Sequence, residues 1–569
     1  MRWHKAIPAL DWLGSYQGQH LVNDSLAAVI VTVMLIPQSL AYALLSGLPA
    51  EMGLYASILP LIAYALFGTS RTLSVGPVAV ASLMTASAVG SVAAAGTADY
   101  ATAAAMLALM GGVMLITLGF LRFGFVANFL SHSVVSGFIT ASGLIIALAQ
   151  VGPLLGVPLS GDTLPHLLSS LVEKASGFHG LTAAIGLGAM VFLIFARNHL
   201  GSLLQSTGVS PRNASLLTRA APLLVMLVVM PLSATRDFES LGVPLVGHVP
   251  SGLPAFSMPF ASWDLVRELT LPALLIALIG FIESVSVGKT LGAKRQQKID
   301  ASQELIGLGA ANVASAVSGG FPVTGGFSRS VVNFDAGADT QMASLLTAFG
   351  IGIAALVLTP ALYYLPKAVL AATIVVAVLS LVDWRTIILA RRFSSADFCS
   401  ILVTIGTTLT LGVELGVLAG VGVSIGMHLY QTTRPHVAVV GQVAGSEHYR
   451  NVDRHEVETH PQLLSIRIDE SLYFANIQYL EEFILYEASL SKEIRHVVVI
   501  FAAVNGLDLS ALEGLESINN RLFDRGIRMH LSEVKGPVMD ALQKTDFLQQ
   551  LSGEVFLTHH GAVHQLTVA

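Results

Sequence analysis

The chain has 569 residues, of which 53% are hydrophobic and 12% are charged, and its mean hydropathy is +0.70. Soluble proteins average roughly 45–50% apolar and about 25% charged residues, so this composition excludes a soluble globular protein and also a disordered chain. The single cysteine, Cys399, excludes an intramolecular disulfide and any site built from several cysteines. The net charge of −6 argues against a nucleic-acid-binding protein.

The first 434 residues have the pattern of a polytopic α-helical membrane protein. Charge-free stretches at 72–98, 123–161 and 340–366 reach the roughly 20 residues that a helix needs to cross a bilayer. With the shorter apolar runs they predict thirteen or fourteen membrane elements. If the N-terminus is inside and fourteen elements alternate, fifteen Lys and Arg residues fall on the inner side. The outer side receives only Lys174, Arg236, Arg267 and Lys367. This positive-inside bias predicts that both termini are cytoplasmic.

Glycine and proline interrupt the apolar pattern at two places, 73–81 (LSVGPVAVA) and 319–330 (GGFPVTGGFSRS). Each interruption predicts a short extended run followed by the start of a helix. They lie about 245 residues apart, which is also the offset between the apolar runs that begin at Ser25 and Thr270. A helix kink would explain either one alone. The matched offset favours an inverted-repeat transporter with a site at mid-membrane, where two helix N-termini would suit a small anion.

Four longer motifs resemble the SulP family of inorganic anion transporters: IPQSLAYA at 36–43, GLYASILPLIAYALFGTSRTLSVGPVAV at 53–80, FLSHSVVSGF at 129–138 and GGFPVTGGFSRSVVN at 319–333. The resemblance implies fourteen membrane elements as a 7+7 inverted repeat, a core domain that moves against a gate domain, and a homodimer. It also implies two half-helices, in the third and tenth elements, with the anion between their N-termini. The candidate substrate-binding residues are Gln38, Tyr42, Pro77, Val78, Thr324, Phe327, Ser328 and Arg329.

Two charged residues are expected inside the membrane. Arg329 would offer the anion a fixed positive charge, and its alternative role is to pair with a carboxylate such as Asp335. Glu283 lies about thirteen residues into the run that begins at Thr270, so it is expected deep in the bilayer. Carboxylates at that depth usually serve an ion or proton path, and the alternative is a structural carboxylate bonded to neighbouring hydroxyls. The segment FIESVSVGKTLG around Glu283 resembles that of proton-coupled SulP sulfate transporters, which implies proton symport with Glu283 as the coupling group.

The tail differs in composition, because residues 435–569 carry 10 basic and 18 acidic residues. We expect a transmembrane domain at 1–434, a linker at 435–462 and a soluble α/β domain at 463–569, with strands at LLSIRI, SLYFAN, HVVVIFA and IRMHLS. The order of elements and the segment VNGLDLSALEGL at 504–515 resemble the STAS domain, here cytoplasmic. Ser510 matches a serine that is phosphorylated in related bacterial anti-sigma-factor antagonists and is the candidate regulatory residue. Its favoured role is to cap the following helix together with Glu513.

The leading hypothesis is a secondary active transporter in a bacterial inner membrane that imports an inorganic oxyanion, with sulfate favoured, together with protons. A bicarbonate or chloride carrier or exchanger of the same family is the first alternative. A non-transporting membrane sensor that signals through the STAS domain is an alternative of another class. No nucleophile–base pair or metal cluster is visible, so neither an enzyme nor a cofactor is expected. The expected partners are the anion, H⁺, membrane lipid and a second copy of the chain, and any cytosolic partner of the STAS domain stays open.

Overall fold

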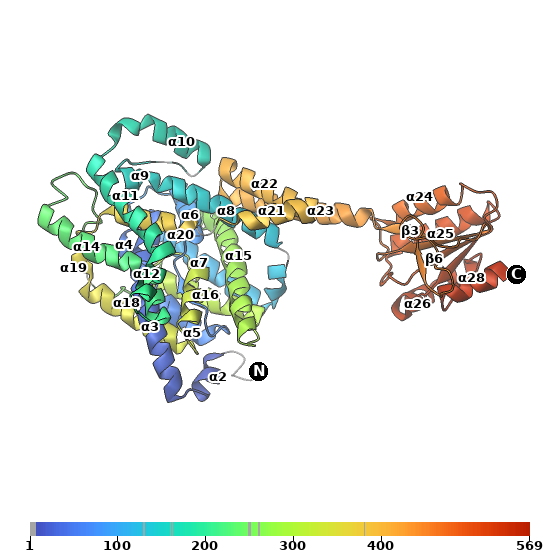
Figure 1. Ribbon diagram of the computed structural model, residues 1–569, viewed down its shortest axis with the longest axis horizontal. Helices are drawn as coiled ribbons and strands as arrows, with labels where there is room; N and C mark the ends of the chain where they lie inside the picture. The colour runs from blue at the N-terminus through green and yellow to red at the C-terminus, as the bar shows by residue number, and fades with distance from the viewer. Residues whose placement is uncertain are drawn as a thin grey trace. The chain divides into compact units, whose positions relative to one another are not determined.

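The computed structural model describes residues 7–128, 131–159, 161, 163–248, 252–259, 262–379 and 382–568. Phe129 and Leu130, which belong to the FLSHSVVSGF motif, lie outside these residues. The chain divides into two compact units, Met1–Ser424 and Ile425–Ala569 (Figure 1). Each unit has its own hydrophobic core.

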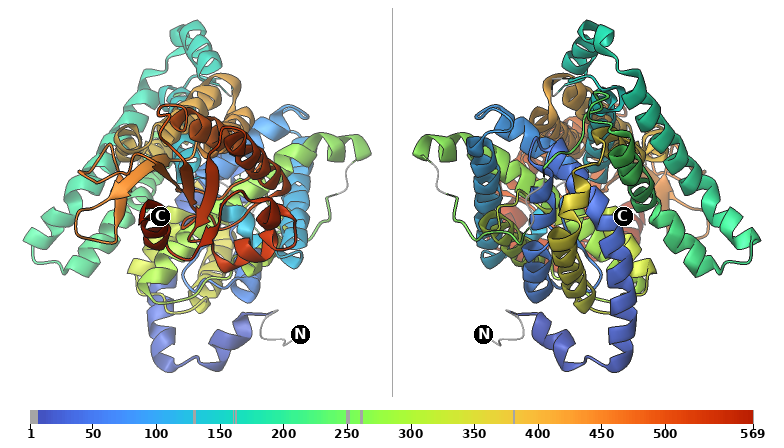
Figure 2. Two further views of the ribbon diagram at one scale, coloured as in Figure 1. Left: turned by 90° about the vertical axis from the view of Figure 1, so that its right-hand side faces the viewer. Right: turned by 90° about the vertical axis from the view of Figure 1, so that its left-hand side faces the viewer.

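Seven helical spans among the described residues are long and apolar enough to cross a membrane. They are α3 (Gly18–Leu45), α4 (Ala50–Tyr55) with α5 (Leu59–Phe67), α7 (Ala98–Phe120), α8 (His132–Ala149) with α9 (Val151–Leu155), α11 (Gly180–Phe195) with η3 (Ala196–Leu200) and α12 (Gly201–Ser206), α15 (Trp263–Lys294) and α23 (Val413–Thr433). Figure 2 shows the start of α3 and the short α2 (Ala9–Gly14) projecting beyond the other helices of the first unit.

Seven shorter membrane elements complete the predicted fourteen in the described part of the chain. They are α6 (Ala79–Gly90), α14 (Ala221–Arg236), α16 (Ala301–Val317), α17 (Phe327–Asp335), α18 (Met342–Val357), α20 (Lys367–Val378) and α22 (Ser395–Leu411). The helices α10 (Leu164–Glu173), α13 (Pro211–Arg219), α19 (Thr359–Leu362) and α21 (Trp384–Phe393) connect them. The fold class expected from the sequence is therefore confirmed, including the two short helices at the glycine and proline interruptions.

Small residues allow the membrane helices to approach closely. The helices α7 and α16 meet at Gly112 and Gly309, and a Cβ added to either glycine would lie within 2.8 Å of the other glycine's carbonyl oxygen. Helix association in a bilayer depends on such close packing, because lipid tails compete with side chains for apolar contact. The pair fixes α16, which in turn supports the chain at the centre of the unit.

That centre is a two-stranded crossing of the two interrupted segments. Strand β1 (Val75–Gly76) precedes α6, strand β2 (Thr324–Gly325) precedes α17, and the two strands pair antiparallel, with Val75 opposite Gly325 and Gly76 opposite Thr324. The pairing satisfies backbone groups that would be costly to leave unpaired in the membrane interior. It also brings the starts of two helices from opposite halves of the sequence to one place.

The second unit holds a six-stranded sheet in the order β4-β3-β5-β6-β7-β8. The strands are β3 (Val437–Gln442), β4 (Tyr449–Asn451), β5 (Leu463–Ile468), β6 (His496–Ile500), β7 (Arg528–Ser532) and β8 (Val555–Phe556). Strands β5 to β8 are parallel, and β3 is antiparallel to β4 and β5. The helices are α24 (Ile477–Glu487), α25 (Leu509–Phe523), α26 (Gly536–Leu542), α27 (Phe547–Gln550) and α28 (His559–Val568).

Three details of this unit differ from the sequence expectations. Strands β3 and β4 fall within 435–462, the expected linker. Because β3 pairs with both β4 and β5, the sheet begins at Val437. The segment SLYFAN is a turn whose Leu472 makes a single bridge to Leu507. Asp508, and not Ser510, caps α25, since its carboxylate accepts from the Ala511 N–H at 2.8 Å. Ser510 lies exposed in the first turn.

A pair of histidines, His530 buried and His496 half-buried, lies on the face of the sheet that α28 covers. His530 is 2% exposed, and its Nδ1 accepts from the Glu554 N–H at 3.0 Å while its Nε2 lies 3.1 Å from Nδ1 of His496. Burial lowers the pKa of His530 from 6.5 to about 4, with the neighbouring His496 adding to the effect, and burial also lowers the pKa of His496. Both rings therefore favour the neutral form more strongly than a free imidazole does.

We expect this pair to make the second unit less stable in acid. Between pH 6.5 and about 4 the unfolded chain binds more protons than the folded chain, so the contribution is complete above pH 6.5 and is lost as the pH falls to about 4. For His530 alone the loss is on the order of 3 kcal/mol. Hydrogen exchange of the β6 and β7 amides in the full chain measures it. His530→Asn should flatten the pH dependence, whereas replacing the exposed His448 with Gln should leave it unchanged.

Candidate functional site

Two helices begin at the crossing without side-chain caps. Val78 precedes α6 and Gly326 precedes α17, and both have extended backbone conformations with no side-chain hydrogen bond to the helix start. The N–H groups of a first helical turn have no partner within the helix. Together with the helix dipole they form a partial positive charge that favours an anion. The crossing thus presents two such ends in one region.

Helix α15 holds β2 in place through Ser284, whose side chain is fully buried. The Ser284 hydroxyl accepts from the Gly325 N–H at 2.8 Å and donates to the carbonyl of Gly280 at 2.5 Å. The Thr324 hydroxyl lies 3.1 Å from that of Ser284 and 3.2 Å from the Gly280 carbonyl. The hydroxyl of Thr324, a predicted donor to the anion, is therefore engaged by α15 in this structure.

Helix α16 supports the same strand from another side. The amide of Asn312 donates to the carbonyl of Val323 at 2.8 Å and accepts from the Val323 N–H at 2.9 Å. The Asn312 side chain thus pairs with the backbone of Val323, directly before β2, as a neighbouring strand would. On the β1 side, the hydroxyl of Ser330 accepts from the Ser74 N–H at 3.0 Å. These bonds leave the crossing little freedom to shift.

The Arg329 side chain reaches back across the crossing to β1. It is 2% exposed, and its Nη2 donates to the carbonyl of Pro77 at 2.7 Å. Its Nη1 is buried and has no hydrogen-bond partner among the described residues. The alternative pairing with Asp335 is wrong, because Asp335 bonds to Arg219 at 2.9 Å. A buried guanidinium with an unused donor, next to two helix starts, is suited to holding an anion.

Two glycines make room for this guanidinium. A Cβ added to Gly76 would lie 2.5 Å from Nη1 of Arg329, and one added to Gly326 would lie 2.9 Å from its Nε. We expect Gly76→Ala to displace the guanidinium and to weaken anion affinity by about tenfold, the loss of one modest hydrogen bond. Titration of the purified protein with sulfate, followed by thermal unfolding, checks this. Gly90→Ala is the matched control, because a Cβ there has nothing within 4 Å.

A cavity of about 470 Å³ leads to the start of α17. Gln38, Phe327 and Ser328 line it, so three of the predicted substrate-binding residues face one space. Its walls come from α3 and α17 on one side and from α11, η3, α13, α14 and α20 on the other. The cavity is large enough for an oxyanion with water around it. Pro77 and Val78 are buried behind it, in the crossing itself.

Glu283 is half-buried on α15, one residue before the serine that braces β2. Its carboxylate interacts electrostatically with Arg329 and with the half-buried Tyr42. Among the described residues no hydrogen bond to Glu283 is found, so a structural carboxylate bonded to Ser284 is not what the structure has. Apolar residues of α8, α15 and α23, such as Phe138, Ile279 and Val417, surround the small space into which Glu283 opens.

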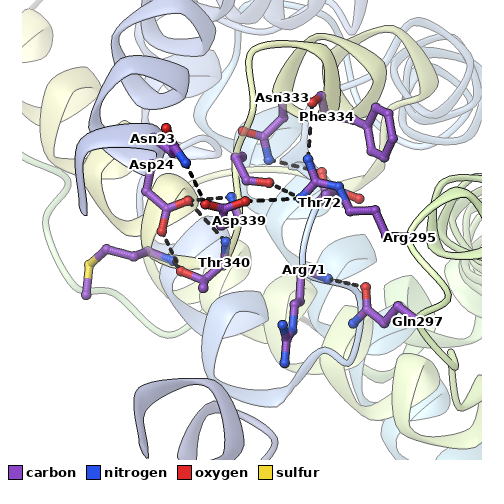
Figure 3. A network of polar contacts seen from close by, with 12 residues as sticks. Asn23, Asp24, Arg71, Thr72, Arg295, Gln297, Asn333, Phe334, Asp339 and Thr340 are labelled. Atoms are coloured by element: carbon purple, nitrogen blue, oxygen red, sulfur yellow. Dashed lines mark hydrogen bonds and ion pairs between the residues drawn. The ribbon is translucent and has the colours of Figure 1, made fainter. Parts of the chain in front are cut away.

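A polar network at the far end of α17 anchors that helix (Figure 3). The Asp24 carboxylate, which is fully buried, accepts from the N–H groups of Asp339 and Thr340 at 2.7 and 3.1 Å and from the Thr340 hydroxyl at 2.6 Å. The Arg295 side chain bonds to the carbonyl of Ala338 and lies over the Phe334 ring. The start of α3, the end of α15 and the turn after α17 are thereby joined.

Residues 21–404 match the sulfate permease family, and residues 454–562 match the STAS domain. A chloroplastic sulfate transporter, 4.1, of Arabidopsis thaliana is 33% identical over 98% of this chain and 82% of its own length. The chain belongs to the sulfate permease family. A Mycobacterium tuberculosis protein named a probable sulfate transporter is 32% identical over 98% of this chain and 97% of its own length. The protein is thus an integral multi-pass membrane protein of a transporter family, and not an enzyme.

Solved structures confirm the fold of this sulfate permease family member. The murine anion transporter solute carrier 26 family member A9, in the inward-facing state, superposes with a TM-score of 0.89 at 24% identity, covering 99% of this chain and 94% of that one. The transmembrane domain of a cyanobacterial bicarbonate transporter, BicA, gives a TM-score of 0.60 at 22% identity, covering 72% and 99%. The STAS domain assignment is likewise confirmed.

The residues that support the site could not be identified from the sequence. Ser284, Asn312 and Ser330 act through backbone groups of segments far away in the chain, and hydroxyl and amide side chains are common in membrane helices. The only signal available was their position on helices next to the interruptions. Arg197 and Arg219, which line the cavity, were assigned to loops on the inner side because of their charge.

Proposed function

We propose that the protein imports an inorganic oxyanion, sulfate, together with protons by alternating access. The observation that carries the proposal is the buried Arg329 guanidinium, whose Nη1 has no partner among the described residues, beside the uncapped starts of α6 and α17. Sulfate has four oxygens that can accept hydrogen bonds from this guanidinium and from the first N–H groups of the two helices. The names of the two curated relatives, both sulfate transporters, support the choice of substrate.

In this proposal the anion binds at the crossing and leaves through the cavity, whose lining includes Arg197 and Arg219 of the inner side. Gln38 and Ser328 contact it on the way, Phe327 and Tyr42 shape the space, and Pro77, Val78 and Arg329 hold it between the helix starts. The braced crossing moves as one body with α3, α15 and α16, which form part of the core domain. The helices on the opposite wall of the cavity belong to the gate domain, and sliding between the two walls exposes the anion to either side.

Glu283 supplies the proton coupling. Its carboxylate and the incoming dianion share the field of one guanidinium, so the ionised carboxylate opposes anion binding. Protonation of Glu283 removes that repulsion and lowers the charge of the loaded core domain, which reduces the cost of moving it through the membrane. Proton uptake and anion binding therefore favour each other, as the reciprocity of linked binding requires.

The proposal includes the membrane in which the protein lies, its orientation there and its oligomeric state. We propose a bacterial inner membrane, cytoplasmic termini and a homodimer, which the positive-inside bias and the resemblance to the family support. The STAS domain then lies in the cytoplasm, where Ser510 is exposed in the first turn of α25 and open to a regulatory partner.

Uptake of labelled sulfate into proteoliposomes tests the proposal, with the membrane potential clamped and with or without an inward proton gradient. We expect sulfate uptake that increases with the gradient. Gradient-independent movement of bicarbonate or chloride, without sulfate uptake, would instead identify the alternative carrier. Absence of transport of all three anions would favour the membrane sensor.

A further inference from the structure

Helix α21 connects two membrane helices and is fixed at both of its ends. It follows α20 and is separated from the start of α22 only by Ser394. The Asp383 carboxylate caps its start by accepting from the Thr386 N–H at 3.1 Å. Its Ala390 is buried, and the helix packs against α22 and α8 (Figure 1). The helix is therefore held where α20 ends and α22 begins.

The rest of the α21 surface carries large apolar side chains that nothing in the described chain covers. They are each between 56% and 86% exposed, and they are Trp384, Ile388, Leu389 and Phe393. A cluster of exposed apolar side chains usually marks an interaction surface. A short helix that lies in the membrane interface buries such side chains at the boundary between headgroups and acyl chains, where Trp is enriched.

Three arginines belong to the same helix. Arg385, Arg391 and Arg392 are exposed, and within the described residues no ion pair or side-chain hydrogen bond is found for any of them. The carboxylates that flank the helix in sequence are engaged elsewhere, because Asp383 caps α21 and Asp397 accepts from a hydroxyl of α8 at 2.6 Å. The three positive charges are therefore free to meet an external anion.

The helical repeat places these basic and apolar side chains on one side of α21. At 3.6 residues per turn, Arg385 and Arg392 lie between Ile388 and Leu389 around the helix axis, and Ala390 lies on the opposite, packed side. Arginine can lay its apolar stem along such a surface and carry its charge to the headgroups. Basic residues on an amphipathic helix at the cytoplasmic membrane surface attract anionic lipids.

Charge decides between a lipid and a second copy of the chain as the occupant of this surface. A two-fold contact would set the same patch of both copies together, and with it the same three positive charges. An anionic headgroup instead complements them. The arginines are among the basic residues predicted on the inner side, where anionic lipids act on juxtamembrane basic segments.

We propose that α21 lies in the membrane interface and binds the headgroups of anionic phospholipids through Arg385, Arg391 and Arg392. Trp384 and Phe393 then lie among the acyl chains. In the orientation proposed above, the lipids are those of the inner leaflet, and they hold the connection between α20 and α22 at the membrane surface. Lipid binding does not depend on which anion is transported, so this inference and the proposed function can fail separately.

Lipid binding by the purified full-length protein tests this inference. Delipidated protein in neutral detergent is titrated with phosphatidylglycerol or phosphatidylcholine, and native mass spectrometry counts the lipids that stay bound. We expect wild type to prefer phosphatidylglycerol. Each basic residue near an anionic surface contributes about fivefold in affinity, so Arg385→Gln with Arg391→Gln and Arg392→Gln should weaken this binding at least tenfold. Arg385→Lys with Arg391→Lys and Arg392→Lys keeps the charge and should keep most of the affinity.

Arg71→Gln with Lys289→Gln and Lys298→Gln is the matched control, because it removes the same charge from three exposed residues outside α21. It should bind phosphatidylglycerol as wild type does. Wild-type binding in the glutamine variant of α21 overturns the proposal, and so does an equal loss in the control. Displacement of the lipid by millimolar glycerol phosphate would mean that the arginines hold a free phosphate anion. A change from dimer to monomer in the α21 variant without loss of lipid would assign the surface to a second copy.

Discussion

Replacing Arg329 by glutamine should abolish sulfate binding and reduce uptake by at least a hundredfold. The change removes the buried positive charge and its forked donors, and each hydrogen bond from a charged group contributes about 1.5–3 kcal/mol. Two such bonds to the anion correspond to a loss of roughly 10²–10⁴-fold in affinity. The carbonyl of Pro77 also loses its partner, which adds a smaller cost in stability. Initial rates in proteoliposomes and thermal protection by sulfate measure both effects.

The matched control is Arg71→Gln, because the Arg71 side chain is exposed and, within the described residues, only its backbone N–H is bonded, to Gln297. The control should transport at the wild-type rate. Arg329→Lys keeps the charge but loses the planar fork, so we expect an intermediate defect. Normal sulfate affinity in a correctly folded Arg329→Gln protein would mean that the anion binds elsewhere.

Replacing Glu283 by glutamine should separate transport from the proton gradient. For each proton carried per anion, the accumulation ratio at clamped voltage rises about tenfold per pH unit in wild type. Glutamine imitates the protonated carboxyl group in shape and charge, so Glu283→Gln should still bind sulfate and exchange it across the membrane. It should not accumulate sulfate when the outside is made acidic. Uptake with and without a gradient, in vesicles clamped with potassium and valinomycin, measures this.

Glu268→Gln is the control, since Glu268 is exposed on the same helix, α15. It should accumulate sulfate as wild type does. Gradient-driven accumulation that persists in Glu283→Gln would remove Glu283 from the coupling mechanism, and the anion site at Arg329 would be unaffected by that result.

Local sequence patterns were enough to predict where the two helices of the site begin. Pro77 and Gly326 interrupt helix formation, so the starts of α6 and α17 could be placed from composition alone, and their matched spacing indicated the inverted repeat. Resemblance then assigned Arg329 and Glu283. The pairing of β1 with β2 could not be predicted, because two-residue strands carry no periodicity. Their register depends on contacts between distant positions, such as Val75 with Gly325.

The details that sequence could not provide depend on tertiary contacts. Asp335 was a candidate partner for Arg329 by proximity in sequence, but α17 directs the two side chains differently and Asp335 meets Arg219 instead. Asp508 is the helix cap in place of Ser510 because α25 begins at Leu509, two residues before the start that a Ser510 cap would give. Strand β4 was missed because it is an edge strand of three residues, and the six-residue β3 was missed because its pairing with β4 and β5 is a tertiary contact.

The central claim is that the anion binds between the starts of α6 and α17, against Arg329. Crystals of the full-length protein grown with selenate test it most directly, because the anomalous scattering of selenium locates the anion without ambiguity. We expect a selenium peak within hydrogen-bonding reach of the Arg329 guanidinium and of the first N–H groups of α6 and α17. A bound selenate that contacts neither helix start, with the crossing unoccupied at saturating selenate, would contradict it.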